Sequence, residues 1–126
     1  MSIFRYKGLD RRIHKIQKGY IGFVQDHHII PKQHRKHPVI LENKFDINSN
    51  NNIFIMPNKK GIIKFRMDPR TLVHDGPHHL YNCYVGEKLD EIYNYKDMET
   101  QSYYLWLFVG FLKNNLRINS QNIPWN

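Results

Sequence analysis

Short apolar segments separated by polar turns predict two β-strands in the first half of the chain. The first covers residues 20–30, where β-branched and aromatic residues surround a pair of histidines, and Pro31 ends it. The second covers residues 53–56 and is closed by Pro57. A turn follows, and residues 62–65 are expected to extend this strand or to pair with it.

Helical patterns occur before and after these strands. Asp10 can cap a short helix that reaches residue 18. A second helix is expected to open at Gly76-Pro77, because proline in the first helical position loses no hydrogen bond. Its predicted apolar face consists of Leu80, Tyr84, Leu89 and Ile92. A final, aromatic helix starts at Asp97 or Thr100 and runs to about Leu116. The expected fold class is α+β, in one domain over residues 1–126.

Composition narrows the cellular context and the class of partner. The chain has 126 residues and a formal net charge of +8, which fits a phosphate-backbone partner, an anionic membrane surface or simply a basic soluble protein. Cys83 is its one cysteine, so an internal disulfide and an all-cysteine zinc cage are excluded. Cys83 is expected to be a small residue of the protein core, carried by a helix. The first residues do not resemble a signal peptide, and the apolar run 103–112 is shorter than the roughly 20 residues that span a bilayer. An intracellular, soluble protein is therefore expected.

Two histidine clusters are the candidate chemistry. His27 and His28 follow Asp26 in an apolar strand, where a buried imidazole needs a polar partner or a metal ion. His74 and His78 lie in a second cluster, at the start of the predicted helix. Histidine serves both as a metal ligand and as a general base near neutral pH. If the two clusters meet, they form a metal site beside a base.

The motifs that contain these histidines resemble a nuclease family. In chain order they are His27-His28-Ile29-Ile30-Pro31, then Asn52-Ile53-Phe54-Ile55-Met56-Pro57, then His74-x-Gly76-x-His78-x-x-Tyr81-Asn82. Together they are similar to the HNH/endonuclease VII superfamily, and most similar to its AHH branch. The resemblance covers residues 26–92. It implies a ββα-metal (His-Me) finger over approximately residues 20–95, in which two strands and a helix hold one divalent ion at a scissile phosphate.

The resemblance also implies individual roles. His28 matches the general base, His27 and His78 match metal ligands, and His74 is a further candidate ligand. Asn52 matches the asparagine that orients the base and steadies the loop before the second strand. Asn48, Asn50 and Asn51 compete with it for that role, and Asn51 is the strongest rival.

One position departs from the family pattern. Asp26 stands where the family has an alanine before the paired histidines. Two registers therefore compete: His27 as ligand with His28 as base, or Asp26 as ligand with His27 as base. The spacing of the first motif favours the first register. Because neighbouring residues of a regular strand face opposite sides, either register is expected to need a twist or bulge near the strand end.

The resemblance implies a metal-dependent endonuclease acting on DNA, most simply on the double strand, with RNA as the alternative. Phosphodiester hydrolysis needs an activated water and a Lewis acid, here one Mg, Mn or Zn ion. Candidate phosphate contacts are Lys32, Arg35, Lys36, Arg66 and Arg70. The basic segment 3–19 is either a phosphate-contacting arm or a solvated helix face.

Three alternatives concern partners and catalysis. The chain could be a non-catalytic nucleic-acid-binding module that holds a structural zinc ion. It could instead be a toxin-type nuclease, which predicts an acidic immunity protein as partner. The aromatic final helix is either part of the core or the surface of a homodimer.

Overall fold

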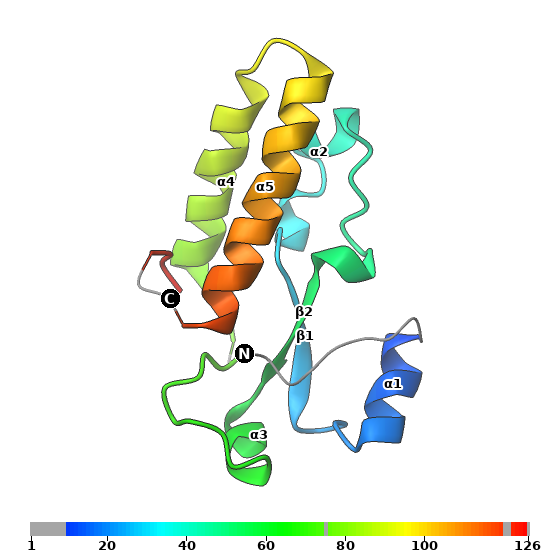
Figure 1. Ribbon diagram of the computed structural model, residues 1–126, viewed down its shortest axis with the longest axis vertical. Coiled ribbons are helices and arrows are strands. Elements are labelled where there is room, and N and C mark those ends of the chain that lie inside the picture. The colour runs from blue at the N-terminus through cyan, green and yellow to red at the C-terminus, as the bar shows by residue number, and fades with distance from the viewer. Residues whose placement is uncertain (1–9, 75, 120–121, 126) are drawn as a thin grey trace.

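The computed structural model describes residues 10–74, 76–119 and 122–125 (Figure 1). In chain order, the helices and strands are α1 (Arg11–Lys18), β1 (Val24–His28), α2 (Pro38–Glu42), β2 (Ile53–Pro57), α3 (Lys59–Lys64), α4 (His79–Tyr93) and α5 (Met98–Arg117). Short 3₁₀ turns cover Lys32–His34 and Asn50–Asn52. The predicted α+β class, with a small two-stranded sheet and an aromatic C-terminal helix, is confirmed.

The two strands form an antiparallel pair in continuous register. His27 lies opposite Phe54 and His28 opposite Ile53, with no bulge between residues 24 and 28. The bulge that the sequence suggested is therefore absent from this pairing. The first strand is also shorter than expected. Gly22 takes a positive φ of 86° in the turn before it, and residues 29 and 30 leave the ladder to become fully buried.

The sequence suggested that residues 62–65 extend the second strand or pair with it. In the structure they do not continue the sheet. Asn58 accepts a hydrogen bond from the amide of Gly61 at 2.8 Å and so caps α3. At Gly61 a β-carbon would lie 2.1 Å from the carbonyl oxygen of Phe23, so only glycine allows α3 to approach the turn before β1 this closely. The cap redirects the chain immediately after β2.

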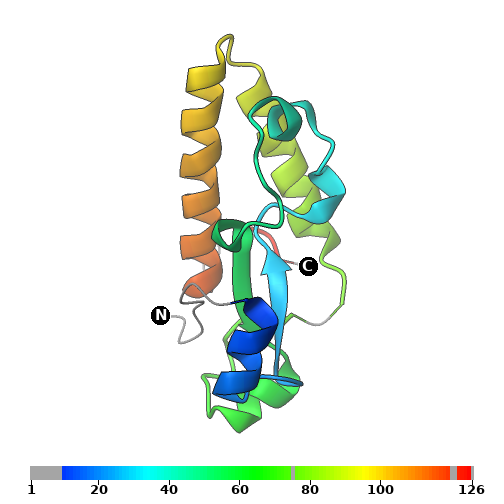
Figure 2. The ribbon, with the colours of Figure 1, turned by 90° about the vertical axis from the view of Figure 1, so that its right-hand side faces the viewer.

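Helices α4 and α5 run side by side and extend beyond one end of the strand pair (Figure 1 and Figure 2). The buried stripe of α4 consists of Tyr81, Val85, Leu89 and Ile92. The sequence placed Leu80 on this face, but Leu80 is 60% exposed, because it lies about 180° around the helix from the buried Leu89. The helix begins at His79 rather than at Pro77. Cys83 is exposed on α4, contrary to the expectation that it lies in the core.

The cap predicted at Asp10 is present, and Asp97, one of the two predicted starts of the final helix, is the N-cap residue of α5. Asp10 accepts hydrogen bonds from the amides at the start of α1, and Asp97 accepts one from the amide of Thr100 in α5. Helix α5 buries Leu105, Val109, Leu112 and Leu116 against the core, which also contains Phe54 and Met56 of β2 and Tyr81 of α4. Among the described helices, none has the length and apolar character needed to cross a membrane.

Candidate metal centre

Three histidines from separate segments meet at one end of the sheet. His27 comes from β1, His74 from the loop after α3, and His78 is the N-cap residue of α4. Each offers one ring nitrogen, and these nitrogens lie within 4.8 Å of one another. The ring centroids are 4.9 Å apart for His27 and His78, and 5.5 Å apart for His74 and His78. The structure thus joins the two clusters that the sequence separates by more than forty residues.

His27 is the most buried member of this histidine triad, with 1% of its surface exposed. Its Nε2 atom is buried and, among the described residues, has no hydrogen-bond partner. Burial lowers the pKa of His27 well below its usual value, and the nearby His78 and His74 lower it further. A neutral imidazole with a buried, unpartnered nitrogen is costly in a plain core and is well suited to bind a metal ion.

The other two rings are oriented by side-chain amides. Nδ1 of His74 lies 2.6 Å from Oε1 of Gln25, and Nδ1 of His78 lies 3.1 Å from Oδ1 of Asn82. An amide oxygen only accepts hydrogen bonds, so Nδ1 carries the proton in both rings and Nε2 keeps its lone pair. Burial lowers the pKa of both histidines. Such outer hydrogen bonds are typical of metal-binding histidines.

Two aromatic residues enclose the triad. The Tyr81 hydroxyl donates to the carbonyl oxygen of Ile29 at 2.6 Å, and its ring lies edge-on to His27. Burial raises the pKa of Tyr81 well above its usual value, so the hydroxyl stays protonated as a donor. Trp125 stacks on His78 with ring centroids 4.5 Å apart and lies edge-on to His27 at 5.1 Å. These contacts restrict the ring positions of two of the three candidate ligands.

The donor set fits a single divalent transition metal ion. Neutral imidazole nitrogens suit zinc, nickel, copper or iron, whereas magnesium prefers oxygen ligands. Among the described residues the cluster contains these three side chains and no carboxylate or thiol. A structural zinc site normally has four protein ligands, whereas a catalytic site keeps one position open. Three protein ligands therefore match the catalytic pattern.

His28 follows the triad residue His27 but has different surroundings. Its Nε2 atom lies 3.1 Å from Oδ1 of Asn48. The amide oxygen accepts the hydrogen bond, which leaves the lone pair of His28 on Nδ1. Burial lowers the pKa of His28, the charges of Lys32 and Arg11 lower it further, and the Asn48 bond and Asp26 oppose the change. The ring is therefore neutral at neutral pH, as a general base must be.

A comparison with protein families identifies the family of the chain. Residues 17–104 match a family described as a nuclease family of the HNH/ENDO VII superfamily with conserved AHH. The chain belongs to the AHH nuclease family. No curated protein and no solved structure matches it significantly. The family implies a nucleic-acid substrate, and the match confirms the resemblance read from the three motifs.

Asp26, which replaces the alanine of the AHH pattern, lies outside the triad. Its carboxylate pairs with Nε of Arg11 at 3.1 Å and with Nζ of Lys15 at 2.9 Å. Strand alternation turns its side chain away from the face that carries His27. Asp26 is thus committed to two cations of α1 and is not brought together with His74 and His78. This placement supports the register in which His27 is the ligand.

The AHH-motif asparagine, Asn52, is fully buried and bonds only to main chain among the contacts described. Its Oδ1 accepts from the amide of Ile30 at 2.8 Å, and its Nδ2 donates to the carbonyls of Ile30 and Ile47. It therefore links the loop before β2 to the segment after β1. The sequence assigned the orientation of His28 to Asn52, but the described hydrogen bond of the His28 ring is to Oδ1 of Asn48. The amide of Asn51 bonds to the Ser49 hydroxyl.

The candidate phosphate-binding residues are exposed but are not gathered at one place by any described contact. Lys32 lies close enough to His28 to lower its pKa. Arg35 donates to the carbonyl of Lys32, and Arg70 is paired with Asp68 at 2.8 Å. Lys36 and Arg66 are solvent-exposed. Of the basic segment 3–19, residues 3–9 lie outside the described residues.

Gln25 and Trp125 of this candidate site had no signal in the sequence, and Asn48 was named only as one of three rivals of Asn52. Asn48 stands among four similar asparagines, and Gln25 is an ordinary polar strand residue. Trp125 lies far from every motif. Each is identified only by its contact with a histidine: Asn48 with His28, Gln25 with His74, and Trp125 with His78.

Proposed function

We propose that the protein is a metal-dependent endonuclease that hydrolyses phosphodiester bonds of DNA, with RNA as the alternative substrate. The observation that carries this proposal is the convergence of three neutral imidazoles around one point, next to a fourth neutral histidine held by Asn48. Family membership supplies the nucleic-acid substrate class. Neither feature alone separates a nuclease from a metal-binding module, but the two together favour the enzyme.

Each histidine has a distinct role in the proposed reaction. His27, His74 and His78 hold one divalent ion, which when bound supplies a Lewis acid for the phosphate group. His28 accepts a proton from water at Nδ1, because Nε2 is committed to Asn48. The water oxygen then bonds to phosphorus as the bond from phosphorus to the leaving oxygen breaks. Tyr81 and Trp125 keep the ligand rings in place and exclude solvent from their sides.

The charge of the protein suits this substrate. A formal charge of +8 favours binding to a polyanion through the release of counterions, independently of sequence. The charge of Lys32 lowers the pKa of His28, which makes Lys32 a candidate phosphate contact beside the proposed chemistry. Double-stranded DNA is the first substrate to test, followed by single-stranded DNA and RNA.

A plasmid-nicking assay tests the proposal. Purified protein is incubated with supercoiled plasmid after removal of bound metal, and then with Zn²⁺, Mn²⁺ or Mg²⁺ added singly. Nicking with at least one ion and none with chelator is the expected result, and His28→Ala is the matched inactive control. Binding of zinc and of DNA without cleavage under any condition would favour a nucleic-acid-binding module instead.

A further inference from the structure

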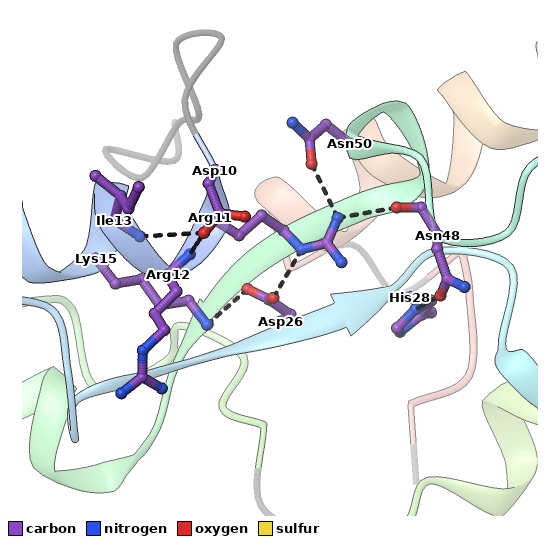
Figure 3. A network of polar contacts seen from close by, with 9 residues as sticks. All are labelled: Asp10, Arg11, Arg12, Ile13, Lys15, Asp26, His28, Asn48 and Asn50. Carbon is purple, nitrogen blue, oxygen red and sulfur yellow. Dashed lines mark hydrogen bonds and ion pairs between the residues drawn. The ribbon is translucent and has the colours of Figure 1, made fainter.

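Arg11 connects three segments of the chain beside His28 (Figure 3). It is the first residue of α1 and lies outside residues 17–104, which match the nuclease family. Its Nε atom pairs with Asp26 of β1 at 3.1 Å. Its Nη1 atom donates to the carbonyl oxygen of Asn48 and to Oδ1 of Asn50, both at 2.9 Å. One guanidinium group thus joins α1, β1 and the loop before β2.

Among the described residues, the only hydrogen bond to the ring of His28 involves this loop. In this bond Nε2 of His28 donates to the side-chain oxygen of Asn48, which is an exposed residue. Two contacts hold the backbone of Asn48: its amide donates to Asp46 at 3.0 Å, and its carbonyl accepts from Arg11. In Figure 3, Arg11 meets the backbone oxygen of Asn48, and His28 lies at the end of the Asn48 side chain. Arg11 thus supplies one of the two described contacts that hold the backbone of Asn48.

We propose that Arg11 is a positioning residue for His28 that acts through Asn48. By fixing the backbone of Asn48, Arg11 keeps the amide oxygen on Nε2 of His28 and leaves Nδ1 free to accept a proton. The ion pair with Asp26 orients the guanidinium group for this task, since a fork of fixed geometry can bond several acceptors at once. The proposal rests on the proposed function, in which His28 is the general base.

A competing role for the same residue is direct contact with the substrate. Arg11 lines a surface groove of about 620 Å³ together with Arg12, Lys15 and Asp26. A phosphate bound in this groove would use Arg11 and Lys15 alike, and loss of either cation would raise KM. A positioning residue, in contrast, lowers kcat and leaves KM unchanged.

Lys15 provides the matched control. It pairs with the same Asp26 carboxylate at 2.9 Å and lines the same groove. It has no described contact with Asn48. Lys15→Met therefore removes one positive charge from the groove without releasing the loop, whereas Arg11→Met removes the charge and the loop contacts together. Arg11→Lys restores the charge but not the two bonds from Nη1.

The kinetic experiment compares these variants in the metal-loaded enzyme. Arg11→Met and Arg11→Lys should lower kcat on the order of tenfold, less than the roughly 10²-fold cost of an ångström-scale misplacement. Lys15→Met should leave kcat unchanged. Asn48→Ala should reproduce the loss of Arg11→Met, and the double variant should lose no more than either single variant, because both changes break one connection.

A second readout does not require activity. In metal-free protein at pH 8, the ¹⁵N shifts of the imidazole nitrogens report which nitrogen carries the proton, and His28→Gln identifies the signals of His28. The wild type and Lys15→Met should show a proton on Nε2 of His28. Arg11→Met and Asn48→Ala should show a mixture of the two tautomers.

Three outcomes would overturn the proposal: an unchanged kcat in Arg11→Met, additive losses in the double variant, or an unchanged tautomer. A raised KM with unchanged kcat in both Arg11→Met and Lys15→Met would assign the groove to substrate binding instead. If the wild type cleaves nothing, the proposed function fails, yet the tautomer measurement still decides whether Arg11 controls the ring of His28.

Discussion

The two faces of β1 lie in different environments, although successive residues of the strand alternate between them. His27 points to the face where His74, His78, Tyr81 and Trp125 meet, and it is almost fully buried. Asp26 and His28 contact polar partners from α1 and from the loop before β2. A strand with period two can thus present a metal ligand and a general base at adjacent positions without placing both in one environment.

The two faces are also held by different forces. Aromatic packing and two amide hydrogen bonds fix the rings of the triad, so that face depends on tertiary burial. The face that carries Asp26 and His28 depends on ion pairs and hydrogen bonds between exposed or half-buried side chains, and each of these interactions is weak. Substitutions on the face of His27 should therefore abolish metal binding. Substitutions on the face of Asp26 and His28 should lower turnover alone.

The largest effect is expected from His27→Ala. This change removes a ligand from the buried face, so metal binding and turnover should both be lost. Calorimetric titration with Zn²⁺ measures the first quantity and plasmid nicking the second. Metal binding equal to that of the wild type would show that His27 is not a ligand.

His28→Ala should separate the two faces most clearly. Turnover should fall by about 10²- to 10⁴-fold, the usual contribution of a positioned base, while metal affinity stays the same. The same titration and nicking assay measure both. Retained activity would exclude His28 as the base, and loss of metal binding would make it a ligand.

An intermediate effect is expected from Asn82→Ala. The change removes the acceptor that orients His78, and loss of such an outer contact typically costs roughly 10- to 100-fold in metal affinity. Asn51→Ala, at an exposed position away from the triad, is the matched control. Equal affinities of the two variants would contradict an orienting role of Asn82.

A smaller effect concerns the stability of the metal-free protein against pH. Burial lowers the folded-state pKa of His27, and that of His74 and His78, below the value of about 6.5 in the unfolded chain. As the pH falls through that value, the unfolded chain binds more protons, so folding stability must decrease. The melting temperature should be higher at pH 7.5 than at pH 5.5. A smaller difference is expected for His27→Gln, and an equal difference would show that His27 does not contribute.

The smallest effect on the metal is expected from Asp26→Asn. Because Asp26 pairs with Arg11 and Lys15 rather than with the triad, its neutral amide should leave metal affinity unchanged and cost about 1 kcal/mol of stability or less. Calorimetry and thermal unfolding measure the two quantities. Weakened metal binding would support the competing register, in which Asp26 is the ligand.

Much of the fold follows from local patterns. Residues close together in the sequence determine the strands near 24–28 and 53–57, the cap at Asp10 and the start of the final helix beside Asp97, and these predictions are confirmed. Two wrong predictions concern which side chains α4 buries. Leu80 was assigned to the apolar face and Cys83 to the core, but α4 buries Tyr81, Val85, Leu89 and Ile92. Leu80 lies about 180° around the helix from Leu89, and Cys83 is exposed.

The sequence by itself determined which residue types could perform the chemistry. Paired histidines in an apolar strand, followed by further histidines before a helix, limit the options to metal binding and base catalysis. Only the tertiary structure decided which nitrogens face one another and which partners hold them. Asn48 rather than Asn52 contacts the ring of His28, and Trp125 and Arg11 reach the site from opposite ends of the chain. The reason is that motif spacing records neighbours along the chain, whereas a side chain's hydrogen-bond partner depends on how distant segments pack.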